Sequence, residues 1–283
     1  MSVSAMLLLR KLFVLTILLI PVVVSAFSKP LQVKVESDWG KADRRDVQAV
    51  IDSVTNVISP YIGGRSLDEI IVRNDEKGPI SLYERGSQGE YIILLDVKDR
   101  YWAQLAYQFA HETCHLLTNY DLAPNNVTRQ QWFEESLCEA FSLFTLKRLA
   151  EQWRQDAPYA NWTPYAAELQ KYADNMLDQQ HRSFAPDLRA WYRKQREVLE
   201  DNPYAHDRML NEKVATHLLK ILQSRPQDWA AINYLNLGED TDDHSLSKYL
   251  NDWYSNTPAE YRQTVAEIQQ LLGVDTLKAQ MDY

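Results

Sequence analysis

Two of the six histidines in the sequence, His111 and His115, lie four residues apart, with Glu112 directly after the first. On a helix, residues i and i+4 share one face, so both imidazoles can reach a single point in space. A metal ion suits that point, because neutral imidazole is a preferred zinc ligand. Glu112 lies about 100° around the helix from His111, beside that point, where it can accept a proton from a water. Two histidines that share a helix face by chance are the alternative.

A second stretch supplies carboxylates where a third metal ligand is required. A catalytic zinc is held by three protein ligands and keeps one open position. The segment WFEESLCEAF, residues 132–141, follows the histidine pair, and Glu135 lies 20 positions after His115. An ordinary amphipathic helix with solvated glutamates does not account for carboxylates at this spacing. The two stretches together indicate a zinc site.

The combination resembles the gluzincin metallopeptidases, in which HExxH is followed by W-x-x-E-G-x-A-E. Residues 111–141 carry the resemblance, with Trp132, Glu135 and Glu139 at matching positions. Ser136 stands where the family has glycine, which is a mild departure. The resemblance implies an α+β fold in which a zincin-like catalytic unit, with a small mixed sheet, precedes a mostly helical C-terminal lobe.

The resemblance also implies a role for each of these residues. His111, His115 and Glu135 are expected to bind Zn²⁺, which leaves one position open for water. Glu112 is expected to be the general base that accepts the proton of that water. Glu139 lies one helical turn after Glu135 and is expected to orient a ligand histidine.

Two assignments keep an alternative, and one further histidine is expected to be structural. Glu134 competes with Glu135 as the third ligand, and Glu135 is favoured because it matches the family motif. Gluzincins use a tyrosine or histidine downstream of the third ligand to stabilise the carbonyl oxygen, which indicates Tyr204, or in its place His206. His217 lies in an apolar helical run and is expected to be a packed core histidine.

The implied function is hydrolysis of peptide bonds in a peptide or protein substrate by a zinc-activated water. The G-x-M-E-N segment of the gluzincin aminopeptidases does not occur in the sequence, so the resemblance does not extend to that activity. The alternative is a zincin-like zinc-binding or scaffolding protein that has lost turnover. Glu112 favours the enzyme, because a purely structural zinc has no use for a base beside it.

Apolar periodicity and helix-capping signals predict the elements that position these residues. Strands are expected at 31–37, 69–73, 80–84 and 90–97, and helices at 41–58, 101–120 and 131–148. Thr128 and Gln131 resemble a capping box at the start of the third helix. Thr257 is expected to cap a further helix, with Pro258 in its first turn. The strand at 90–97 is expected to be the sheet edge that pairs with an extended peptide.

The first 26 residues have the pattern of a cleaved secretory signal peptide. Arg10 and Lys11 precede an apolar run at 12–24, and small residues follow at the expected cleavage point. The run is shorter than the roughly 20 residues that span a bilayer, so an uncleaved anchor is the less favoured alternative. The sequence predicts an exported protein, periplasmic or secreted, without stable membrane insertion. An α/β part at 27–125 carries the HExxH helix, and a helical part at 126–283 carries the third ligand.

Charge and cysteine content add two expectations. The formal net charge of −9 repels phosphate backbones and argues against nucleic-acid binding. The only two cysteines, Cys114 and Cys138, lie on the two expected ligand helices. In an oxidising compartment they can form a disulfide, and the alternative is a pair of buried thiols that behave as small apolar residues.

Overall fold

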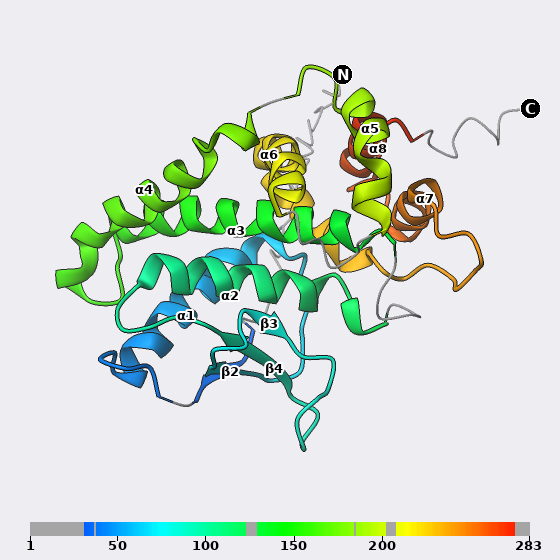
Figure 1. Ribbon diagram of the computed structural model, residues 1–283. Coiled ribbons are helices and arrows are strands. Elements are labelled where there is room, and N and C mark those ends of the chain that lie inside the picture. Colours follow the sequence, from blue (N-terminus) through cyan, green and yellow to red (C-terminus); the bar gives the residue numbers. More distant parts are fainter. Residues whose placement is uncertain (1–30, 37, 123–128, 184, 202–207, 275–283) are drawn as a thin grey trace, which may run out of the picture.

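The computed structural model describes residues 31–36, 38–122, 129–183, 185–201 and 208–274. The fold is α+β and mostly helical, as the sequence predicts. Figure 1 shows a small sheet on one side of the molecule, with α1 and α2 against it. α3 packs on α2, and α4 and α6 pack on α3. The predicted signal peptide lies outside the described residues.

The sheet has four strands in the order β1-β2-β4-β3. The strands are β1 (Val33–Val35), β2 (Ile70–Asn74), β3 (Ile80–Ser81) and β4 (Tyr91–Leu95). β1 pairs in parallel with β2, β2 pairs in parallel with β4, and β3 pairs antiparallel with β4. All four predicted strands are therefore present. β2 has its predicted length and is shifted by one residue, and the other three are shorter than predicted.

The prediction that the strand at 90–97 forms the sheet edge is wrong. β4 lies between β2 and β3, and all five of its residues, YIILL, are buried. A strand enclosed in this way has a continuous apolar run rather than an alternating pattern. The edge nearest α2 is the two-residue strand β3, where Ser81 Oγ donates a hydrogen bond of 2.9 Å to the carbonyl oxygen of Glu112.

The helices lie above the sheet and across one another. They are α1 (Arg44–Ile58), α2 (Trp102–Leu117), α3 (Gln131–Trp153), α4 (Ala166–Leu177), α5 (Leu188–Asp201), α6 (Arg208–Ser224), α7 (Leu246–Asn256) and α8 (Arg262–Leu272). Short 3₁₀ helices connect several of them, namely η1 (Ser59–Tyr61), η2 (Tyr120–Leu122), η3 (Ala160–Tyr165), η4 (Gln180–Arg182) and η5 (Pro226–Tyr234).

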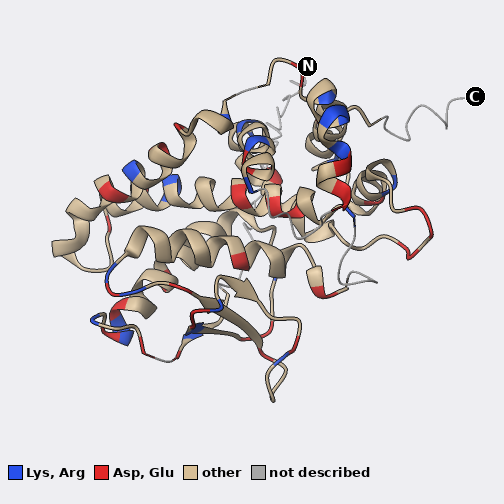
Figure 2. Ribbon diagram, viewed as in Figure 1, with Lys and Arg blue, Asp and Glu red and all other residues tan. Residues whose placement is uncertain are grey.

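α2 is the central helix and is buried almost all round. It contains neither glycine nor proline, and it ends three residues before the predicted end because Asn119 adopts a left-handed conformation, φ 60°. Glu112 is its only Asp, Glu, Lys or Arg. Figure 2 shows the contrast with α5, on the outside of the molecule, which carries charges of both signs. A lone acid on a buried helix requires a specific reason.

α3 is five residues longer than predicted, and its predicted capping box is wrong. The N-cap residue is Gln130, whose side chain makes no capping hydrogen bond, and Thr128 lies outside the described residues. A Thr-x-x-Gln pattern is only a local signal, whereas α3 begins where Trp132 and Phe133 enter the core. Tertiary burial therefore decides where this helix starts.

The predicted helix start at Thr257 is also wrong. Thr257 is the C-cap of α7, where its Oγ1 donates a hydrogen bond of 2.6 Å to the carbonyl oxygen of Trp253. α8 starts later, at Arg262. Threonine can satisfy a free carbonyl at a helix end as well as a free N–H at a helix start, so the residue type does not distinguish the two ends.

One hydrophobic core runs through the described part of the chain, from Leu31 to Val274. Its largest fully buried side chains include five tryptophans, Trp39, Trp132, Trp153, Trp229 and Trp253. The boundary predicted at residue 125 falls within 123–128, outside the described residues. Among the described helices, none combines the length and hydrophobicity that crossing a lipid bilayer requires.

Candidate metal centre

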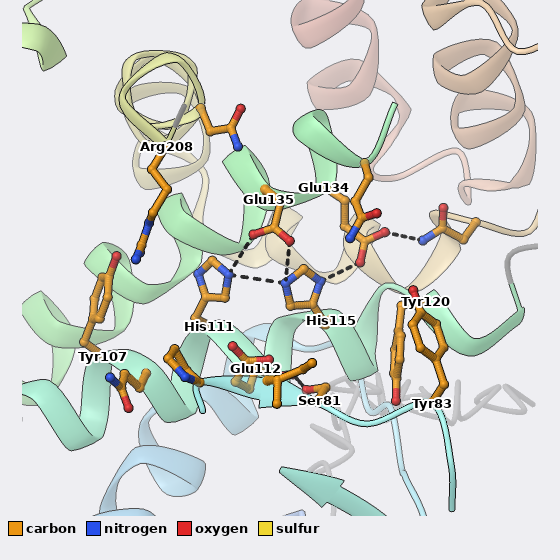
Figure 3. A pocket seen from close by; sticks show the side chains of 16 residues that line it. Ser81, Tyr83, Tyr107, His111, Glu112, His115, Tyr120, Glu134, Glu135 and Arg208 are labelled. Carbon is orange, nitrogen blue, oxygen red and sulfur yellow. Dashed lines mark hydrogen bonds and ion pairs between the residues drawn. The ribbon is translucent and has the colours of Figure 1, made fainter. Parts of the chain in front are cut away.

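The packing of α3 on α2 brings the three predicted metal ligands together. His111 Nε2 lies 3.2 Å from Glu135 Oε2, and His115 Nε2 lies 3.5 Å from Glu135 Oε1. The two Nε2 atoms are 3.2 Å apart. Figure 3 shows both imidazole rings rising from α2 toward the Glu135 carboxylate, which descends from α3.

This arrangement fits a zinc ion by both spacing and chemistry. Two nitrogens bound at 2.0–2.1 Å to one tetrahedral zinc lie roughly 3.3 Å apart, close to the separation of the two Nε2 atoms. One ligand atom from each of His111, His115 and Glu135 lies within 4.8 Å of the other two. Two imidazoles and one carboxylate form a donor set that catalytic zinc uses. These residues can hold the ion that the sequence motif implies.

The charges of these residues shift the pKa values of their neighbours. Burial by itself would lower the pKa of His115, but Glu135 and Glu134 raise it well above the ordinary histidine value. Burial would likewise raise the pKa of Glu135, but His115 and His111 hold it well below the usual range. The carboxylate is therefore ionised, which is the form that binds a cation.

Glu134, the competitor for the ligand role, orients His115 instead. Its Oε1 lies 2.6 Å from His115 Nδ1 and accepts a hydrogen bond of 3.0 Å from Thr118 Oγ1. Its Oε2 accepts one of 2.7 Å from Asn236 Nδ2, and Tyr249 OH donates in turn to Asn236 Oδ1 at 2.8 Å. A carboxylate on Nδ1 fixes the ring so that Nε2 faces the ligand position.

The expected role of Glu139 in orienting a ligand histidine is wrong. Glu139 is buried and accepts hydrogen bonds from Tyr107 OH and from Arg182 Nη2, the latter at 2.6 Å. Arg182, on η4, has a fully buried side chain and also lies 3.3 Å from Glu212. η4 brings this arginine to Glu139 from outside the two ligand helices, so the motif itself contains no sign of it.

A second group with metal-binding atoms, His115, Glu134 and Cys138, lies behind the first. It fits a metal poorly, because His115 Nδ1 and Glu134 already share a hydrogen bond. Burial and a hydrogen bond with Cys114 raise the pKa of Cys138 well above the usual thiol value. A protonated thiol is not a zinc ligand. Both cysteines are buried, free thiols in the structure.

A cavity of about 380 Å³ opens beside the three ligands. Glu112 lines it and is only 4% exposed. The Glu112 carboxylate forms no hydrogen bond or ion pair with another residue of the described part of the chain. Pro79 and Ile80 of the β3 segment form one wall, so the sheet edge borders the ligands. A base without a protein partner, beside a metal position, is suited to accept a proton from water.

The structure describes only one of the three remaining residues that the sequence singled out. Tyr204 and His206 lie outside the described residues. His217 is a core histidine as predicted, because it is buried and its Nε2 accepts a hydrogen bond of 3.2 Å from the backbone N–H of Ala185. Burial, with Lys213 and Lys220 nearby, lowers the pKa of His217 to about 4.

Several cavity-lining residues were not predicted from the sequence, and three of them are polar side chains from different elements. Tyr107, Arg208 and Asn236 all reach the cavity, from α2, α6 and the segment after η5. Tyr107 lies four residues before His111 and could have been found from the same helical spacing. Nothing local marks Arg208 or Asn236, because only the tertiary fold brings them to the cavity.

Comparison of the chain with protein-family models, with curated proteins and with solved structures gave no match. The case for function therefore depends on the residues and their geometry.

Proposed function

We propose that the protein is an exported zinc-dependent peptidase of the gluzincin type, with a zincin-like catalytic unit. The observation that carries the proposal is the convergence of His111, His115 and Glu135 beside the unpaired carboxylate of Glu112. All four line one cavity. A metal that served only to stabilise the fold would need neither an open cavity nor an unpaired base at its side.

Each residue of the site has a separate role in the proposed hydrolysis. Bound zinc supplies a Lewis acid that makes a water nucleophilic near neutral pH. The Glu112 carboxylate accepts the proton of the attacking water and delivers it to the nitrogen of the leaving amine. Glu134 holds the tautomer and orientation of His115 throughout. Tyr204 or His206 remains the predicted donor to the carbonyl oxygen.

The sheet edge at the cavity supports a peptide or protein as the substrate. β3 is the last strand in the sheet order, and it pairs with β4 on one side only. An extended peptide can add to such an edge through backbone hydrogen bonds, which places its carbonyl groups along the cavity. A peptide or protein substrate therefore suits the site better than a compact small molecule.

The test separates metal binding from chemistry by two substitutions. Glu112→Gln keeps the side-chain shape and the metal ligands, so zinc should remain near one per chain while peptide turnover falls about 10²–10⁴-fold. Glu135→Ala leaves two ligands, so zinc and activity should be lost together. Glu168→Gln, on the exposed face of α4, is the matched control and should change neither. Zinc analysis and a peptide-library digest on the same preparations provide both readouts.

Three results would contradict the proposal. Full activity in Glu112→Gln would remove the assigned base, and full zinc content in Glu135→Ala would remove the assigned third ligand. A wild-type protein that binds zinc and cleaves nothing in the library would favour the inactive zinc-binding or scaffolding protein. Export has its own test, since the mass of the mature protein should correspond to a chain that begins at or near Phe27.

A further inference from the structure

Arg208 brings a positive charge to the cavity, and no residue that the structure describes neutralises it. It lies in the first turn of α6 and lines the cavity. In Figure 3 its side chain extends from α6 toward the hydroxyl group of Tyr107, on the His111 side of the site. Its guanidinium forms no hydrogen bond or ion pair with any other residue that the structure describes.

Two described carboxylates near Arg208 are already engaged elsewhere. Glu139 accepts from Arg182 and Tyr107. Glu212 pairs with Arg182 and His181. Burial by itself would lower the pKa of Arg208, but Tyr107 and Glu139 raise it, so the group stays charged. The guanidinium therefore keeps its five donors available for a ligand in the cavity.

Asn211 adds a second polar group to the same wall. It follows Arg208 by three residues on α6, so both side chains lie on one face of the helix. Asn211 is 5% exposed, lines the cavity, and its Oδ1 has no hydrogen-bond partner. Its amide has no side-chain hydrogen bond within the described residues. Oδ1 is the buried end of the amide, whereas Nδ2 is not among the buried atoms without a partner, so its N–H groups can donate to a ligand.

We propose that Arg208 and Asn211 form a subsite that binds a carboxylate group of the peptide substrate. Guanidinium binds carboxylate through two parallel hydrogen bonds, and an amide N–H can complete the contact. Among the described residues that line the cavity, Arg208 is the only lysine or arginine, and Glu112, Glu134 and Glu135 are the acidic ones. The α6 wall therefore supplies the side-chain cation for a substrate carboxylate. The carboxylate belongs either to the free C-terminus of the peptide or to an Asp or Glu side chain.

This inference rests on the proposed function, but its test does not require turnover. Peptide binding is measured by calorimetry on zinc-loaded Glu112→Gln protein, so that the peptide is not consumed. Four versions of one library-derived peptide are compared, with a free or amidated C-terminus and with Asp or Asn as the acidic residue. Loss of affinity on amidation identifies the C-terminus, and loss on the Asp-to-Asn change identifies the side chain.

Variants of the subsite should remove this preference. Arg208→Gln should weaken the carboxylate-bearing peptide roughly 10- to 100-fold and leave the version without a carboxylate unchanged. Arg208→Lys should weaken it less, because the charge remains while the paired hydrogen bonds are lost. Asn211→Leu should weaken it by a smaller factor. Arg193→Gln, exposed on α5 and away from the cavity, is the control and should change nothing.

Three outcomes would overturn the subsite. They are equal affinity of the zinc-loaded Glu112→Gln protein for all four peptides, no binding of any of them, or an equal loss for all four when Arg208→Gln is added. Kinetic measurements on protein with Glu112 intact add a check, since an equal fall in kcat for every peptide would place Arg208 at the reacting carbonyl instead. A binding preference without hydrolysis would leave the subsite standing and refute the peptidase.

Discussion

Glu135 and Glu139 lie one turn apart on α3, but they differ in their partners and in their exposure to the cavity. Glu135 faces two imidazole nitrogens and the cavity, and its side chain is 29% exposed. Glu139 is enclosed by Tyr107 and Arg182, with its side chain 4% exposed. The first carboxylate can exchange partners with a metal ion and water, whereas the second is held in a closed network.

The contrast shows how neighbours decide what a buried carboxylate does. A buried charge is stable only when other groups compensate it. At Glu139 the compensation comes from Arg182, a permanent cation that leaves no room for a metal. At Glu135 it comes from histidines, whose lone pairs a metal can use. Four predictions test this contrast. They compare the metal ligands, which face the cavity, with buried polar residues that do not bind the metal.

The largest effect is expected from Arg182→Met, which removes the cation from the closed network. Glu139 would then be a buried charge with only the Tyr107 hydroxyl as a partner, and Glu212 would keep only His181, at a cost of about 3–5 kcal/mol in unfolding free energy. Urea denaturation measures the loss. Zinc per folded chain should not change, because Arg182 does not touch the ligands. Arg45→Met, at an exposed ion pair with Asp43, is the control and should leave stability nearly unchanged.

The next effect is a dependence of stability on pH that comes from His217, a buried histidine beside Lys213 and Lys220. The pKa of His217 is lowered to about 4 in the folded protein, against an ordinary value of about 6.5. The stability it contributes is present above pH 6.5 and is lost as the pH falls toward 4, up to about 3 kcal/mol. His217→Gln should remove this part of the acid destabilisation. Identical pH curves for variant and wild type between pH 7 and pH 4 would refute the assignment.

A smaller effect is expected when the carboxylate behind His115 is changed. Glu134→Gln should weaken zinc binding about 10- to 100-fold, because the hydrogen bond that orients His115 loses its charge. Glu139→Gln is the matched variant one helical turn away from the ligands, and it should reduce stability while zinc affinity stays the same. Competition with a chelator measures both affinities. A larger loss of zinc affinity in Glu139→Gln would reverse the two roles.

The smallest effect is expected at the thiol pair between the ligand helices. Cys114→Ala removes a small buried group and should cost about 1 kcal/mol in unfolding free energy, with zinc content unchanged. Thiol titration of the denatured, unreduced protein should find two thiols in the wild type and one in the variant. No titratable thiol in the wild type would show that Cys114 and Cys138 form the disulfide instead.

Local sequence was enough to predict much of the site. The i, i+4 spacing places His111 and His115 on one face whatever surrounds the helix, since that spacing follows from backbone geometry alone. The match of Glu135 to the gluzincin motif led to its choice over Glu134, and Glu135 is the one that faces both imidazoles. The core role of His217 followed equally from its apolar neighbours.

The tertiary structure decided what depends on partners far apart in the chain. It gave the orienting role to Glu134 rather than Glu139, because Asn236 reaches the first and Arg182 the second. It placed β3 at the sheet edge in place of β4, because strand order is a matter of non-local pairing. It brought Arg208 to the cavity through the packing of α6 on α3. Helix periodicity states which side chains share a face, and only the packed fold determines what that face meets.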